Sequence, residues 1–228
     1  MGGCRENNKL VLDNALFTTK QGGVSKGVYE SLNLGLHVGD NAKDVLQNRE
    51  ILRQSLGLKK LVFMEQIHSN HVEILKDENQ ALSPCDAVIT NLKNIGLCAM
   101  VADCMPILLV SDSVVAAVHA GRAGIIQKIT SKTINLMREK FNAGDIKVIV
   151  GPHIKGSCYE IGNLDLGEFN KFVKNSKFDM KEALLDELKD IPNLSVQISE
   201  ICTHCDENYF SYRSEKTTGR FVGVCYLN

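Results

Sequence analysis

The sequence predicts a mixed α/β (α+β) fold in which residues 1–228 form a single domain. Short apolar runs of strand length follow one another without regular strand–helix alternation, and most helical patterns come after them. The chain is long enough to bury one large core. Its sequence contains no internal repeat, no low-complexity tract and no linker rich in Pro, Gly or Ser.

The first hundred residues are predicted to form strands around one helix. Residues 9–18 are expected to form a strand, and residues 18–40 form a glycine-punctuated loop of a length that is usually functional. Asp40 is expected to cap a helix over residues 42–56, which Gly57 ends. Further strands are predicted over residues 61–64, 71–75, 87–90 and 97–101.

The centre of the chain predicts a buried β-hairpin. Residues 105–110 and 114–118 are apolar, and a short polar turn separates them. Cys104 stands just before the first strand and His119 just after the second, so both lie at the same end of the sheet. A thiol beside an imidazole is the arrangement of a metal site or of a nucleophile–base pair. The glycines of the following HAGRAG segment would let a helix start close to this site.

The rest of the chain is predicted to be mainly helical. A helix over residues 125–141 carries its apolar residues on one stripe, and Gly144 ends it. The elements predicted after it are a buried strand over residues 146–150, helices over residues 165–174 and 180–189, and a closing strand over residues 221–227.

A third candidate ligand precedes the hairpin. His68 follows an apolar strand and, with Cys104 and His119, completes a His2Cys set from three separate segments. Three protein ligands leave one tetrahedral position open, which is typical of catalytic rather than structural zinc. Such a zinc ion would polarise water or stabilise an incoming oxyanion. The alternative is that each side chain serves core packing or a local backbone hydrogen bond at a strand end.

The other cysteines give weaker indications. Eight cysteines dispersed through the chain, with no N-terminal secretory signal, favour reduced thiols in a cytoplasmic protein. Cys202 and Cys205 form one CxxC, but no second CxxC completes a structural zinc site, so the segment is interpreted as a polar turn. Cys158 is a candidate nucleophile, with His153 as a possible base. Cys98 lies in an apolar strand and is expected to be a core residue.

The net charge and the hydropathy of the chain argue against nucleic acid and membranes as binding partners. The net charge is −1, so neither nucleic acid nor an anionic membrane surface is expected to bind. The apolar runs are far shorter than a bilayer span, so no membrane insertion is expected. An anion such as phosphate could be bound by an arginine fork, although each arginine could also be solvated or paired with a carboxylate. The candidates are Arg49, Arg122, Arg213 and Arg220.

Several sequence blocks together identify a family. They are, in chain order, residues 18–40 and the segments NRE, EQIHSNHV, DAVIT, VADCMPILL, AAVHAGRAG, GPHIKGSCYEIG and CTHCDENYFSYRSEKTTGR. With these blocks the chain resembles the YfiH-like family, formerly described as multicopper polyphenol oxidases or laccases. Its members are now regarded as zinc-dependent purine nucleoside phosphorylases with adenosine deaminase activity. The resemblance covers nearly the whole chain, and it implies layered mixed β-sheets flanked by helices, with His68, Cys104 and His119 as zinc ligands.

The resemblance also implies reactions and partners. Phosphate would split adenosine, inosine, guanosine or methylthioadenosine into a free base and a sugar 1-phosphate, so purine nucleosides and phosphate are the expected partners. Water would deaminate adenosine at C6, which needs an acid–base group. Asp103 is the nearest candidate by sequence, and its alternative role is to cap a turn. Polar contacts to sugar or phosphate are expected from Asn33, Arg49, Gln66 and Arg122.

The chain departs from the family pattern beside the predicted site. The family commonly has HAGWRG where this chain has HAGRAG, so Arg122 stands one position before the family arginine and Ala123 replaces it. Ser214 replaces the second arginine of the common FSYRRD block. These changes affect the expected binding of substrate and leave the predicted zinc ligands in place.

Two other functions remain as alternatives. The older family description suggests copper-dependent phenol oxidation, but a multicopper site needs clustered histidines, and the six histidines here are dispersed with no HxH. Copper would still occupy a His2Cys site adventitiously, because its affinity exceeds that of zinc. A non-enzymatic protein, or one acting in cell-wall precursor quality control, would use a structural metal to hold the hairpin to the strand before His68.

Overall fold

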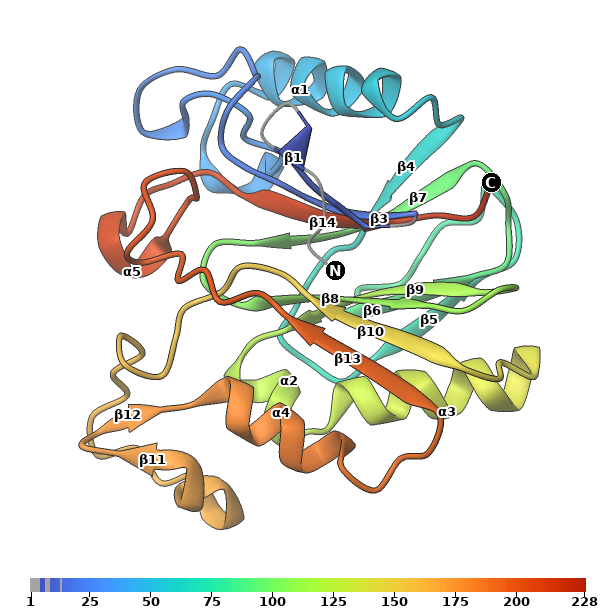
Figure 1. The fold of residues 1–228 in the computed structure, drawn as a ribbon. Helices are drawn as coiled ribbons and strands as arrows, with labels where there is room; N and C mark the ends of the chain where they lie inside the picture. The colour runs from blue at the N-terminus through green and yellow to red at the C-terminus, as the bar shows by residue number, and fades with distance from the viewer. Residues whose placement is uncertain (1–4, 7–8, 13) are drawn as a thin grey trace.

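The computed structural model describes residues 5–6, 9–12 and 14–228, and its strands form two six-stranded mixed sheets that lie face to face (Figure 1). The first sheet has the strand order β1 (Arg5–Glu6), β2 (Lys9–Leu12), β3 (Ala15–Thr18), β14 (Phe221–Cys225), β7 (Ile95–Val101) and β4 (Lys60–Phe63). The second has the order β13 (Leu194–Ile198), β10 (Ile146–Val150), β8 (Met105–Val110), β9 (Val115–Ala120), β6 (Ala87–Thr90) and β5 (Val72–Leu75).

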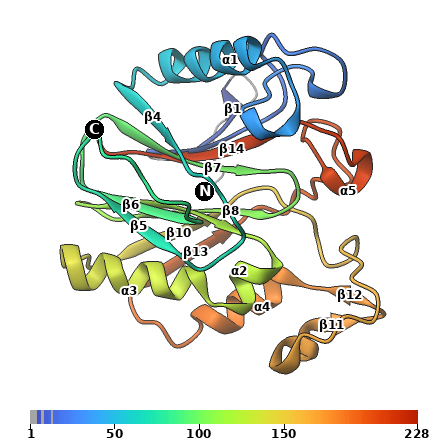
Figure 2. The same cartoon turned by 180° about the vertical axis from the view of Figure 1, so that it is seen from behind.

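Helices cover the outer faces of both sheets and so make four layers. The α-helices are α1 (Ala42–Ser55), α2 (Arg122–Ile126), α3 (Ile129–Phe141), α4 (Met180–Leu188) and α5 (Tyr212–Glu215). Figure 1 and the reverse view in Figure 2 show α1 on the first sheet and α2, α3 and α4 on the second. The predicted mixed α/β fold with layered sheets is therefore confirmed. None of the described helices is both long and apolar enough to cross a membrane.

The central strands form continuous apolar runs because both of their faces are covered. In β9, Val115 and Ala117 pack in the space between the sheets, whereas Ala116 and Val118 pack toward the helices of the second sheet. This alternation follows from the two-residue period of a strand. A strand buried on both faces needs no polar residue at every second position, which is why the predicted hairpin was recognisable as two apolar runs.

One aromatic ring fills the space between the two sheets at a point where glycines make room for it. Phe17 in β3 is fully buried there. A Cβ on Gly151, the residue after β10, would lie 2.4 Å from this ring, and a Cβ on Gly223, in β14, would lie 2.8 Å from it. Because interiors are close-packed, the second sheet can approach the ring this closely only while Gly151 lacks a side chain, and Gly223, the neighbour of Phe17 in the first sheet, leaves room for the ring beside it.

The long loop before α1 is held by one buried amide. The side-chain oxygen of Asn48 in α1 accepts from Val24 N at 2.8 Å. Its side-chain nitrogen donates to Ser25 Oγ at 2.9 Å, Ser31 O at 3.1 Å and Asn33 O at 2.9 Å. The loop contains the two short 3₁₀ helices η1 (Gly27–Tyr29) and η2 (Leu36–Val38) and is ordered by these polar contacts.

Three predicted elements differ in the structure. Residues 9–18 form two antiparallel strands, β2 and β3, because the chain turns between them at Asn14, which has a φ of 60°. The single helix predicted over residues 125–141 is divided into α2 and α3, because Lys128 takes a left-handed φ of 56°. Residues 165–174 form the 3₁₀ helix η3 (Gly167–Phe172) and the short strand β11 (Val173–Lys174), which pairs with β12 (Lys177–Phe178), in place of an α-helix.

The predicted cap of α1 is also wrong. The side chain of Asn41 accepts from Lys43 N at 2.9 Å and caps the helix. Asp40 instead accepts from Ser25 Oγ at 2.6 Å and from Asn33 Nδ2 at 2.9 Å, so its carboxylate closes the preceding loop. The strand β13 and the helix α5 were not indicated by the sequence patterns.

Replacing Gly151 with alanine is expected to lower the free energy of unfolding by about 1–3 kcal/mol, because the new methyl group overpacks the ring of Phe17. Gly144→Ala is the matched control, since a Cβ at Gly144 meets no atom within 4 Å. Urea denaturation of both variants and the unmodified protein measures the effect. Equal midpoints for Gly151→Ala and the unmodified protein would contradict this account of the sheet spacing.

Candidate metal centre and its cavity

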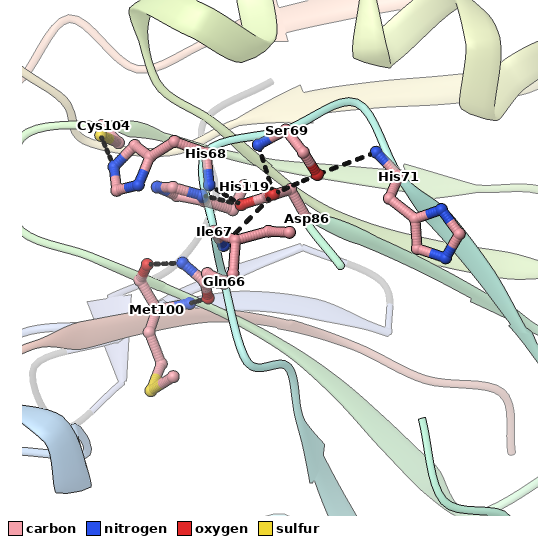
Figure 3. Close-up of polar contacts among 9 residues, drawn as sticks. All are labelled: Gln66, Ile67, His68, Ser69, His71, Asp86, Met100, Cys104 and His119. Atoms are coloured by element: carbon pink, nitrogen blue, oxygen red, sulfur yellow. Dashed lines mark hydrogen bonds and ion pairs between the residues drawn. The ribbon is translucent and has the colours of Figure 1, made fainter. Parts of the chain in front are cut away.

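Three candidate metal ligands meet at one end of the β8–β9 hairpin. His68 lies in the turn after β4, Cys104 immediately precedes β8, and His119 lies in β9 opposite Pro106. Their ligand atoms all lie within 4.8 Å of one another, and His68 Nε2 is 4.0 Å from Cys104 Sγ (Figure 3). The predicted hairpin is confirmed, but β9 runs to Ala120, so His119 lies inside the strand rather than just after it.

A buried carboxylate orients this cluster. Asp86 is fully buried immediately before β6 and accepts from His119 Nδ1 at 2.8 Å (Figure 3). It also accepts from the backbone N–H groups of Ile67 at 3.3 Å, His68 at 3.0 Å and Ser69 at 2.6 Å, and from the Ser69 hydroxyl at 2.8 Å. These bonds leave Nε2 of His119 for a metal and fix the turn that carries His68.

The charges of this cluster are coupled. Burial alone would raise the pKa of the Cys104 thiol, but the adjacent His119 lowers it to about 6. Burial alone would lower the pKa of His119, but the Cys104 sulfur and the Asp86 carboxylate raise it to about 9. At neutral pH the metal-free cluster therefore holds a thiolate beside an imidazolium. A cation that binds there displaces the imidazole proton.

Two backbone features let the ligands approach one another. A Cβ on Gly121 would lie 2.9 Å from Cys104 Sγ and 3.2 Å from His68 Cδ2, so the ligands occupy the space of its missing side chain. His68 has a φ of 58°, in the left-handed region that residues other than glycine rarely adopt. Strained backbone conformations of this kind are frequent at functional sites, where contacts with the surrounding structure stabilise them.

The donor set fits the zinc ion that the family resemblance implies. One thiolate and two imidazole nitrogens are preferred zinc donors, and three protein ligands leave a position open. A carboxylate orients the ring of His119, as is usual for a metal-bound histidine. Copper accepts the same donors. The three side chains therefore form a candidate metal site with two imidazoles and one thiol.

The cluster lines a cavity of about 400 Å³. Its apolar lining includes Met100, Ile154 and Met180, and two tyrosines, Tyr159 and Tyr212, add aromatic surface. A mostly apolar cavity with a few convergent polar groups is the usual form of a small-molecule binding site.

Basic side chains also line this cavity. They are His37, Arg213 and Arg220. Arg213 donates through Nη2 to Glu160 O at 2.9 Å, and its guanidinium carbon lies 5.2 Å from the ring centroid of Tyr159. Burial lowers the pKa of Arg220, but an arginine keeps its charge at neutral pH. Two fixed positive charges in a partly enclosed cavity favour an anionic ligand.

Two of the sequence-predicted binding residues lie at this cavity or support it. Gln66 lines the cavity, but its amide is bonded to the backbone of Met100 through two hydrogen bonds of 2.8 Å (Figure 3). Asn33 is fully buried, and its side-chain oxygen accepts from Arg220 N at 2.8 Å, so it positions a residue of the lining. Direct contact of either amide with substrate stays a prediction.

The other two predicted binding residues, Arg49 and Arg122, are not among the described residues that line the cavity. The guanidinium of Arg49 donates to Leu34 O at 2.9 and 2.7 Å and lies 3.7 Å from the ring centroid of Phe63. Arg122 is the first residue of α2. Their roles in substrate binding also stay predictions.

Asp103 lines the cavity but turns its carboxylate toward the C-terminal segment. Its Oδ1 accepts from Thr203 Oγ1 at 2.7 Å and from Ser211 Oγ at 2.8 Å, and its Oδ2 accepts from Arg213 N at 2.6 Å. These contacts match the turn-capping alternative for this residue. Its part in proton transfer stays a prediction.

Sequence reasoning missed the role of Asp86. This residue directly precedes a fully buried apolar strand, where a carboxylate is costly unless it has partners. That position was the available signal. The partners themselves come from the turn after β4 and from β9, and only the paired sheet brings them together.

Two solved structures share the fold. A protein of Neisseria meningitidis superposes with a TM-score of 0.83 at 30% identity, covering 98% of this chain and 96% of that chain. The Bacillus licheniformis hypothetical protein YfiH superposes with a TM-score of 0.88 at 26% identity, covering 98% and 97%.

The sequence relatives decide the family. A family model described as "Multi-copper polyphenol oxidoreductase laccase" matches residues 14–228. A purine nucleoside phosphorylase of Corynebacterium glutamicum is 39% identical over 230 residues, covering 93% of each chain. The chain belongs to the YfiH family. Another YfiH-family relative, the purine nucleoside phosphorylase YlmD of Bacillus subtilis, is 32% identical and covers 96% of this chain and 90% of its own.

Replacing Gly121 with alanine is expected to weaken zinc binding by roughly 10–100-fold, because the new methyl group crowds the sulfur of Cys104. The backbone at Gly121, with φ −80° and ψ −177°, suits alanine, so the fold should persist. Competition against a chromophoric chelator measures affinity, and circular dichroism checks the fold. An unchanged affinity would show that the ligands do not need this space.

The variant Asp86→Asn is expected to weaken metal binding by roughly 10–100-fold and to lower the pKa of His119, because the charge that orients and stabilises its ring is lost. Zinc titration and a proton NMR titration of the metal-free imidazole measure the two effects. Asp112→Asn, at an exposed position in the hairpin turn, is the control. An unchanged pKa of His119 would refute the proposed coupling.

Proposed function

We propose that this protein is a zinc-dependent purine nucleoside phosphorylase that also deaminates adenosine. The observation that carries the proposal is the His2Cys cluster in the wall of a mostly apolar cavity that two arginines also line. Relatives at 39% and 32% identity that are named purine nucleoside phosphorylases support it.

The cavity has the size and lining for a nucleoside. Its volume of about 400 Å³ lies in the range of small-molecule sites. A purine is a flat, largely apolar ring, which Tyr159 and the side chains of Met100 and Ile154 can contact. The basic side chains supply the polar part of the lining, where a phosphate ion would bind.

Phosphorolysis requires a phosphate oxygen to attack C1′ of the sugar while the bond from C1′ to the purine nitrogen breaks. The positive charges of Arg213 and Arg220 would hold the phosphate and offset its charge through the transition state. Burial, together with the charges of Arg220 and Arg49, lowers the pKa of His37. This histidine is therefore neutral at pH 7, and its ring can donate one hydrogen bond to phosphate or accept one from a sugar hydroxyl.

The role of the three candidate metal ligands is to hold a metal ion in the wall of the cavity. When bound, zinc supplies a Lewis acid at this wall of the cavity. His68, Cys104 and His119 would hold it, and Asp86 keeps the imidazole of His119 in orientation. Negative charge develops on the purine as it leaves in phosphorolysis and on the purine ring when water adds at C6, and a positive charge at this wall would stabilise both.

Deamination would use the same cavity with water in place of phosphate. Water adds at C6 of adenine and ammonia leaves, so a group must accept and return a proton. Among the described lining residues Asp103 is the one carboxylate, which supports assigning it this role. In that role the carboxylate of Asp103 would first accept a proton from the attacking water and then return one to the leaving ammonia.

Zinc-loaded protein is expected to form adenine from adenosine by phosphorolysis only when phosphate is present. Without phosphate it is expected to form inosine from adenosine by deamination. His68→Ala should reduce both rates by at least about 100-fold, because one of three metal ligands is lost. Chromatography separates the products. His71→Ala is the matched control, since this exposed histidine pairs with Glu73 outside the cluster.

Other outcomes would favour the alternative functions. If zinc stays bound and neither product forms, the proposed activity is wrong. If Cys104→Ala fails to fold, the metal is structural and the non-enzymatic alternative is favoured. If the copper-loaded protein oxidises a phenol with its His2Cys site intact and turns over no nucleoside, the oxidase alternative is favoured.

A further inference from the structure

Three thiols gather beside the cavity in a second cluster. Cys158 lies in the loop after β10, and Cys202 and Cys205 lie in the turn after β13. Their sulfur atoms all lie within 4.8 Å of one another, and those of Cys158 and Cys205 are 3.4 Å apart. We propose that Cys158, Cys202 and Cys205 form a second metal site, which takes zinc through three thiolates and is separate from the His68, Cys104 and His119 site.

The spacing of the sulfur atoms suits a shared ion. A Zn–S bond of about 2.3 Å places the sulfur atoms of a tetrahedral site about 3.8 Å apart. The 3.4 Å between Cys158 and Cys205 and the 4.8 Å limit for the cluster lie on either side of that value. The three cysteines are free thiols, so the sulfur atoms remain available as ligands.

The backbone around Cys202 is arranged to stabilise a thiolate. Cys205 N and Asp206 N both donate to Cys202 O, at 3.1 and 3.0 Å, so the CxxC segment forms the predicted turn. Lys155 N donates to Cys202 Sγ at 3.4 Å. N–H donors to sulfur favour the charged form that a metal needs.

Three cationic side chains bind backbone carbonyls close to the cluster in the sequence and would offset its charge. Three thiolates around one Zn²⁺ leave a net charge of −1, which is stable near positive groups. Lys177 Nζ donates to Ser157 O at 2.6 Å, and Arg213 Nη1 donates to Cys158 O at 3.4 Å. Lys155, whose backbone N–H donates to Cys202 Sγ, has its Nζ bonded to Ser199 O. Cys205 is exposed, so the fourth position of the ion would face solvent.

The second cluster is connected to the substrate cavity. Thr203, between the two cysteines of the turn, donates through its hydroxyl to Asp103 beside the first metal site. Tyr159 follows Cys158 and lines the cavity. Arg213 also lines the cavity, and it donates a hydrogen bond to Cys158 O. An ion that joins Cys158 to the CxxC turn would therefore fix this wall of the cavity.

Zinc stoichiometry in the full, reduced chain tests the site. We expect roughly two zinc ions per unmodified chain and roughly one in Cys158→Ser and in Cys205→Ser, because each variant removes one of three ligands. Cys205 is exposed, so its replacement should leave the fold intact. Cys98→Ala is the matched control, since it removes a buried thiol of neither cluster and should still bind roughly two.

Cobalt substitution separates the two sites by their ligands. In Cys104→Ser the first site loses its only sulfur, so any remaining thiolate-to-cobalt charge-transfer absorption must come from the second cluster. We expect this absorption to persist in Cys104→Ser and to disappear in Cys104→Ser/Cys158→Ser. These readouts need no catalytic activity, so they are independent of the proposed phosphorolysis.

Three results would overturn the proposal. One is a zinc content of roughly one ion per unmodified chain that Cys158→Ser and Cys205→Ser leave unchanged. Another is a folded Cys104→Ser protein, fully reduced by thiol titration, that shows no cobalt–thiolate absorption. The third is a Cys158–Cys205 disulfide that forms in preference to metal binding, which would appear as two missing thiols.

Discussion

The buried carboxylate of Asp86 is the contact on which the first metal cluster depends. Burying an ionised carboxylate costs several kcal/mol unless its oxygens are paired. Here burial is offset by His119 and by the N–H groups and hydroxyl of the turn that carries His68, and the pKa of Asp86 falls to about 2. One acid thus joins that turn to β6 and β9, and it positions two of the three ligands.

The second constraint is steric. Cys104, His68 and Gly121 come from three segments, and their approach requires that one of them lack a side chain. Phe17 between Gly151 and Gly223 repeats this arrangement in the core, where two sheets meet. Close packing makes such positions intolerant of a single added methyl group. The fold and the metal site therefore share one requirement, the absence of Cβ atoms at points of closest approach.

Asp103 connects the two clusters. Its backbone lies next to Cys104, and its carboxylate binds Thr203 and Ser211, which belong to the C-terminal segment. Through this carboxylate the CxxC turn and the backbone of Arg213 form one polar network next to Cys104 of the first candidate metal site. A metal at the second cluster would strengthen that network by joining the loop of Cys158 to it.

The sequence alone determined the elements whose patterns are local. The hairpin around Cys104 and His119 and the strand 146–150 follow from apolar runs, and α1 follows from helical periodicity. Breaks such as the left-handed Lys128 escaped prediction, because residues other than glycine adopt that conformation only when tertiary contacts compensate.

Only the tertiary structure decided which residues that are far apart in the sequence come into contact. Spacing along the chain could nominate His68, Cys104 and His119, since each stands near a strand end. It could not supply Asp86 or the pairing of Cys158 with a CxxC far downstream. The physical reason is that pairing and burial are set by strand order and layer packing, and these depend on the whole chain at once.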